Sequence, residues 1–127
     1  MEYSKRIHLL THKGKKIYYF DFSGLRADEH PWIMDLAFEL AIKQEEKTLR
    51  YISNVANTRL NIESKNKAKA FYAKLAGLGF QIKAATIGLT AWQRLIVSTI
   101  DRKMFFSNDL EKAKEYLVNE DSPNVAG

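Results

Sequence analysis

The chain has 127 residues, of which 46% are hydrophobic and 28% charged, and this size and composition predict one soluble domain over residues 1–127. It contains no cysteine, which excludes disulfides, thiolate metal sites and cysteine nucleophiles. The net charge is +5, but the lysines are interspersed with acidic residues, so we do not expect nucleic acid as a partner.

The first 25 residues predict a β-hairpin. Apolar residues mark strands at residues 7–11 and 17–22. Between them, His12-Lys13-Gly14-Lys15 supplies a turn with glycine where a positive φ is needed. Ser23-Gly24 then ends the second strand.

The next segment predicts a helix of unusually apolar composition. Asp28 suits its N-cap, Pro31 is tolerated in its first turn, and the pattern runs to about Glu46. Its polar residues form one narrow stripe, and the rest of its girth is apolar. Such a helix contacts more than one apolar surface, so it either packs deep in the domain or covers a subunit contact.

Strands and helices alternate in the remainder of the chain. The predicted strands are residues 49–55, 82–87 and 103–106, and the predicted helices are residues 63–78, 90–100 and a last one capped by Asp109. The strand at 82–87 ends at Gly88 and continues straight into a helical pattern, which is typical of a parallel-sheet strand and its crossover. The order ββαβαβαβα predicts an α/β fold with a mainly parallel sheet of four or five strands, packed with four helices. The polar segment 120–127 is expected to be a flexible tail.

Four groups of residues carry a resemblance to a known family. Residues 12–25 look like its opening hairpin, and Asn54-Val55 with Thr58-Arg59-Leu60 is similar to the end of its third strand and the following loop. Gly88-Leu89-Thr90, and Phe105-Phe106 before residues 109–113, are similar to its last two strand–helix units. In this order and spacing, over residues 6–118, they resemble the STAS domains, and among them the SpoIIAA-like group of small stand-alone bacterial proteins.

The resemblance implies a sheet of four or five strands with helices packed against it. It also implies a non-catalytic regulatory module that binds other proteins, like the anti-sigma factor antagonists of the family. Those bind a protein kinase and are switched off when it phosphorylates a serine in an Asp-Ser-x-Gly setting. Ser64 is the matching candidate for a phospho-switch, although Glu63 replaces the aspartate and the glycine is missing. The alternative is that Ser64, or Asn61 before it, only caps a helix.

Two surfaces are candidates for binding. In open α/β sheets, ligands bind at the edge where the carboxyl ends of the strands meet, and the residues expected there are Asn57, Thr58, Arg59, Gly88, Leu89 and Thr90. Trp32, Phe38 and Trp92 belong to apolar surface in excess of what one small sheet plainly covers. They predict an apolar interface, whose simplest use is a homodimer, and the alternative is a full core.

The sequence predicts no catalytic residue, metal site or cofactor. His8 and His12 would share one strand face about 13 Å apart, too far to hold one ion, and His30 stands alone. The serines have no neighbouring histidine motif and no Gly-x-Ser-x-Gly elbow, and the glycines form no phosphate-binding pattern.

We therefore expect a cytoplasmic protein that is not an enzyme. No secretion signal and no apolar run of membrane-spanning length occur in the sequence. Its expected partner is another protein or a second copy of itself. The alternative function is binding of a lipid or small molecule in an apolar pocket under the first and third helices.

Overall fold

A computed structural model describes residues 3–91, 94–95 and 104–123 of the chain. The strands are β1 (Ile7–His12), β2 (Lys15–Asp21), β3 (Thr48–Asn54), β4 (Gln81–Ile87) and β5 (Phe105–Phe106). The α-helices are α1 (His30–Ile42), α2 (Ile62–Gly77) and α4 (Leu110–Val118), and two short 3-10 helices are η1 (Tyr3–Arg6) and η2 (Ala27–Glu29).

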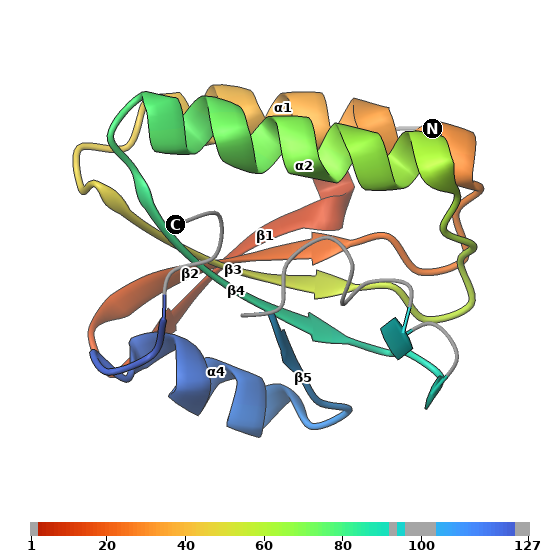
Figure 1. Ribbon diagram of the computed structural model, residues 1–127. Helices are drawn as coiled ribbons and strands as arrows, with labels where there is room; N and C mark the ends of the chain where they lie inside the picture. Colours follow the sequence, from red (N-terminus) through yellow and green to blue (C-terminus); the bar gives the residue numbers. More distant parts are fainter. Residues whose placement is uncertain (1–2, 92–93, 96–103, 124–127) are drawn as a thin grey trace.

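The strands form one mixed sheet in the order β1-β2-β3-β4-β5 (Figure 1). β1 is antiparallel to β2, and all other neighbouring strands are parallel. Helices α1 and α2 cover one face of the sheet, and α4 covers the other (Figure 1). The predicted α/β class, with an opening hairpin and a mainly parallel sheet, is confirmed.

The hairpin turn is formed by the residues that the sequence indicated. Lys13 and Gly14 both have positive φ, 50° and 77°, and follow the last paired residue of β1. Two consecutive residues with positive φ match the twist of the flanking strands in a two-residue hairpin.

β4 lies inside the sheet, with a parallel strand on each side. Six of its seven residues are buried, as expected for a strand covered on both faces. It ends at Gly88, whose φ is 85° and where an added Cβ would come within 2.7 Å of the backbone nitrogen of Ala56. Only glycine therefore fits between the end of β4 and the loop that follows β3.

The helices depart from the prediction in number and in boundaries. The described residues contain three α-helices rather than four, because the helix predicted at 90–100 falls largely outside them. Asp28 does not cap α1: it lies in η2, and α1 begins at His30 with proline in its first turn, where a missing N–H costs nothing. α1 also ends at Ile42 rather than near Glu46. The side chain of Gln44 donates to the carbonyls of Glu46 and Thr48, which closes a turn into β3 instead of extending the helix.

The sheet separates two hydrophobic cores. The larger core lies on the α1/α2 side and contains Phe20, Tyr51 and Phe71. The smaller core lies on the α4 side and contains Ile52 and Leu117. Tyr51 and Ile52 are consecutive in β3, so alternation along this strand supplies one side chain to each core.

Candidate ligand-binding cavity

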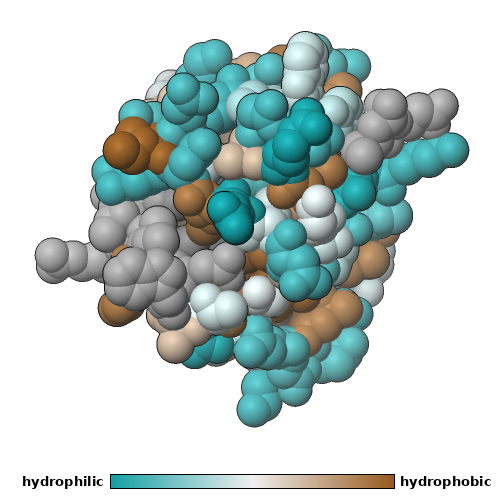
Figure 2. All heavy atoms as spheres, turned by 90° about the vertical axis from the view of Figure 1, so that its right-hand side faces the viewer, coloured by the Kyte–Doolittle hydropathy of each residue, from teal (hydrophilic) through white to brown (hydrophobic). Residues whose placement is uncertain are grey.

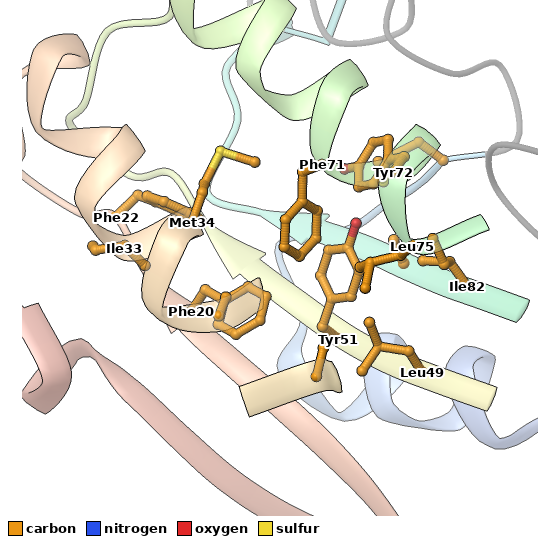
Figure 3. Packing of buried hydrophobic residues seen from close by; sticks show 14 of the residues in the cluster. Phe20, Phe22, Ile33, Met34, Leu49, Tyr51, Phe71, Tyr72, Leu75 and Ile82 are labelled. Carbon is orange, nitrogen blue, oxygen red and sulfur yellow. The ribbon is translucent and has the colours of Figure 1, made fainter. Parts of the chain in front are cut away.

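A cavity of about 70 Å³ lies in the core on the α1/α2 side. Its walls are mostly aromatic and aliphatic, with Phe20 from the sheet, Met34 from α1 and Phe71 from α2 (Figure 3). Roughly 15 Å³ of space for a water centre is enough for one water molecule. The cavity therefore has room for several waters or for a small organic group.

The hydroxyl of Tyr51 is buried in this core without a hydrogen-bond partner among the described residues. Tyr51 is 2% exposed, and Figure 3 shows its hydroxyl directed toward the helix that carries Phe71 and Tyr72. Its ring is packed at 5.2 Å from that of Phe20 and at 6.0 Å from those of Phe71 and Tyr72. Because these contacts hold the ring, the hydroxyl stays directed into the core, and leaving it unpaired costs about 1–3 kcal/mol.

Two more hydroxyls line the same cavity. Ser53 lies two residues after Tyr51 on the same face of β3, and it pairs in register with Thr86 of β4. Within the described part of the chain, neither side-chain hydroxyl makes a hydrogen bond. We call Tyr51, Ser53 and Thr86 the hydroxyl floor of the cavity.

A histidine closes the cavity where α1 begins. His30 is buried, and its Nε2 lies 2.8 Å from the Thr58 hydroxyl oxygen, while that hydroxyl donates to the carbonyl of Leu25. A carbonyl can only accept, so Thr58 gives its proton to Leu25, and His30 Nε2 donates to Thr58. Burial lowers the pKa of His30 against the raising effect of Glu29 and Asp28, which favours the neutral ring. The pair ties the loops after β2 and β3 to α1.

Among the described residues that line the cavity, the charged side chains are of one sign. Its lining includes Lys65, which is half-buried, and no carboxylate from the described residues. Lys65 belongs to the first turns of α2, and the N-terminal end of a helix carries partial positive charge. The electrostatic environment at this end of the cavity therefore favours an electron-rich group.

Ser64, the candidate phospho-switch, also lies at the start of α2. It is 5% exposed, and its hydroxyl accepts from the backbone N–H of Asn61 at 2.8 Å and donates to the Asn61 carbonyl at 3.0 Å. The Asn61 side chain accepts in turn from the Ser64 N–H, so these residues form a capping box. The capping role given above as the alternative is thus present, and a kinase would reach the hydroxyl only after this cap opens.

The residues predicted for the binding edge do lie after β3 and β4, but they differ in exposure. Asn57, Arg59 and Thr90 are exposed, Gly88 is half-buried, and Thr58 and Leu89 are buried. Asn57 and Arg59 line a groove together with Gly24 and Arg26. Figure 2 views the molecule from the carboxyl ends of the parallel strands, and hydrophilic side chains predominate over the described part of this face.

Two of the three residues of the predicted apolar interface, Trp32 and Phe38, lie in the described part of the chain. Trp32 is 60% exposed and stacks on Tyr3 at 6.3 Å. Phe38 is half-buried on the side of α1 that faces α2, with Lys74 Nζ 5.3 Å from its ring. Trp92 lies outside the described residues.

The described residues do not test the predicted pocket under the first and third helices, because the predicted third helix, residues 90–100, falls largely outside them. The cavity lies under α1 and α2, the first and second helices of the chain. Right-handed crossovers between successive parallel strands that run in one direction across a sheet put both helices on the same face, which brings α1 and α2 together here. The hydroxyl floor was not predicted, although polar Tyr51 and Ser53 at a two-residue spacing within an otherwise apolar strand are a usable indication of a polar site.

No protein-family model matches the chain, and searches of curated proteins and of solved structures find no significant match. Among the described residues, no cluster of three or more histidine, aspartate or glutamate side chains could hold a metal ion. In the same part of the chain, no helix has the length and apolar character needed to cross a membrane.

Proposed function

We propose that this chain is a non-catalytic binding protein of STAS-like, SpoIIAA-like architecture that holds a small, mostly apolar ligand in the cavity on the α1/α2 side. The observation that carries the proposal is the buried, unpaired Tyr51 hydroxyl in the core that holds this aromatic-walled cavity. Ligand sites in proteins are typically apolar hollows with a few convergent polar groups. The opening hairpin, the parallel strands after it and the helices on both faces support the STAS-like architecture.

The cavity's position in the fold also supports a ligand. Ser53, Leu60 and Lys65 are half-buried lining residues at the carboxyl end of β3 and at the loop and helix that follow it. This is the edge at which open α/β sheets bind ligands. The absence of cysteine from the sequence is in keeping with action in the cytoplasm.

The proposal is tested by searching the purified protein for bound molecules and by filling the cavity with a larger side chain. Native mass spectrometry of the purified protein should detect a small copurified molecule. Ala68, a half-buried lining residue on α2, should lose binding when replaced by leucine. Ala73→Leu, at an exposed position of the same helix, is the matched control and should bind as the wild type does. Equal binding by both variants would contradict the proposal.

Protein recognition is the second candidate function, and the groove at the carboxyl edge favours it. Arg59 is exposed in this groove and has no ion pair within the described residues. An acidic segment of a partner would suit it. Arg59→Glu should then abolish capture of that partner from the native host, while Lys69→Glu, an exposed site on α2 away from the groove, should not.

If the protein binds other proteins, its partner can also be a second copy of the chain. The exposed Trp32, stacked on Tyr3, is the apolar surface from which we propose it. Sedimentation velocity should then show a dimer for the wild type and a monomer for Trp32→Ala. A monomeric wild type at micromolar concentration would remove this partner.

A further inference from the structure

We propose that the ligand of this cavity is a small monocarboxylic acid, with its carboxylate on the hydroxyl floor and its short apolar body against the aromatic walls. The inference rests on the proposed function, because it names the chemical class that the same cavity takes.

The hydroxyl floor consists of groups that can donate hydrogen bonds. Tyr51, Ser53 and Thr86 each carry a hydroxyl that can donate, and no partner for these hydroxyls occurs in the described residues. Ser53 and Thr86 are register partners on adjacent strands, and Tyr51 is two positions along the same face. Strand geometry separates such positions by about 5–7 Å, so one compact group can meet donors from both strands. A carboxylate accepts hydrogen bonds at two oxygens and has no proton to place, which fits a floor made of donors.

The described residues around the hydroxyl floor favour a negatively charged ligand. Lys65 lines the cavity and makes no ion pair within the described part of the chain. No aspartate or glutamate from that part lines the cavity, so nothing there repels an anion. The positive end of α2 acts in the same direction. A hydrogen bond between a donor and a charged acceptor is roughly twice as strong as a neutral one, so these donors gain more from a carboxylate than from an amide or an alcohol.

The volume of the cavity limits the size of the ligand. The cavity of about 70 Å³ is small, and an apolar cavity of about 150 Å³ is known to accommodate benzene. The apolar body is therefore short, no more than about three carbons by that comparison. Phe20, Met34 and Phe71 supply the surface that it contacts. A free phosphate does not fit this description, because it would leave the aromatic walls without an apolar partner.

The experiment compares isobutyrate with isobutyramide, which has the same shape and no charge. Each is titrated into the full-length protein at pH 7, and the methyl resonances of Met34 and Met104, both at the cavity, are followed by NMR. Isobutyrate should bind about tenfold more tightly than the amide. Lys65→Met should lower the affinity for isobutyrate several-fold and leave that for the amide unchanged. Lys69→Met, an exposed position on the same helix, is the matched control and should change neither.

The outcomes distinguish a failure of the carboxylate inference from a failure of the proposed ligand-binding function. Equal affinity for acid and amide, with no effect of Lys65→Met, overturns the carboxylate inference and leaves an apolar ligand site standing. Binding of neither compound overturns the carboxylate inference, and if a broader set of neutral apolar compounds also leaves the Met34 resonance unmoved, the proposed function fails with it. Tyr51→Phe gives a second reading, since it should weaken isobutyrate binding while the protein remains folded.

Discussion

Arg50 and Lys83 lie side by side on β3 and β4, and both donate hydrogen bonds to carbonyl oxygens at the C-terminal end of α4. Arg50 Nε lies 3.1 Å from the Leu117 oxygen, and Lys83 Nζ lies 3.1 Å from that of Asn119 and 3.2 Å from that of Glu120. The last carbonyls of a helix have no partner inside the helix and carry partial negative charge. Two buried cations therefore fasten α4 to the sheet, and burial together with the neighbouring Arg50 charge lowers the pKa of Lys83.

Removing one of these cations should loosen α4. Arg50→Met leaves the Leu117 carbonyl without its donor and removes the ion pair with Glu46. We expect the free energy of unfolding to fall by about 1–3 kcal/mol, the usual cost of an unpaired buried polar group. Urea denaturation measures this change. Lys112→Met, at an exposed position on α4, should stay within about 0.5 kcal/mol of the wild type, and an Arg50 variant no weaker than this control would be evidence against the fastening role.

The unpaired Tyr51 hydroxyl predicts opposite effects on stability and on binding. Tyr51→Phe removes a buried donor that no described residue satisfies, so the ligand-free variant should be as stable as the wild type or more stable by up to about 3 kcal/mol. Ligand affinity should fall in the same variant. Tyr19→Phe is the control, because the Tyr19 hydroxyl accepts from Asn54 Nδ2 at 2.8 Å and its loss should destabilise the protein. Thermal unfolding in the absence of ligand distinguishes the two, and a destabilised Tyr51→Phe would show that its hydroxyl is already satisfied.

His30 should make stability depend on pH in the mildly acidic range. Burial lowers its pKa in the folded protein below the ordinary value of 6.5. The unfolded chain therefore takes up the proton first as the pH falls, and the free energy of unfolding decreases from about pH 6.5 down to the folded-state pKa. Urea midpoints at pH 7.5 and pH 5.5 should differ less for His30→Gln than for the wild type. His8→Gln, at an exposed site on β1, should keep the full difference, and the same loss in both variants would remove His30 as the cause.

Gly88 should be the glycine that tolerates substitution least among those with positive φ. Gly24→Ala meets only the backbone penalty, since φ is 70° and no atom lies within 4 Å of the position that the new Cβ would take; that penalty is about 1–2 kcal/mol. Gly88→Ala adds a clash at 2.7 Å with the Ala56 nitrogen, so it should cost distinctly more. Denaturation midpoints of the two variants test the ranking, and equal midpoints would mean that the loop after β3 moves aside freely.

The sequence predicted the fold well where one local pattern determines one structure. The hairpin turn at Lys13-Gly14 and the buried strand ending at Gly88 were both found in this way. The start of α1 was predicted wrongly, because Asp28 is a good cap by type but η2 intervenes before the helix. Capping rules consider one helix at a time, so they do not predict that a 3-10 helix comes directly before an α-helix.

The cavity is harder to predict for a different reason. Its volume depends on how side chains from α1, α2 and the sheet fill the space between them, and no single segment carries that information. The identity of two floor residues was within reach, since Tyr51 and Ser53 share one face of β3. That Thr86 lies beside them could not be predicted, because this depends on the register of β3 against β4.

Both layers beside the sheet contain completely enclosed side chains, and the cavity described above lies in the α1/α2 layer. On the α4 side, Ile17, Ile52 and Leu117 are completely enclosed, and the paired cations hold the covering helix in place. None of the described residues of this α4 core lines the cavity on the other side of the sheet. Changes to the shape of the cavity should accordingly begin with the residues of α1 and α2 and leave the α4 layer untouched.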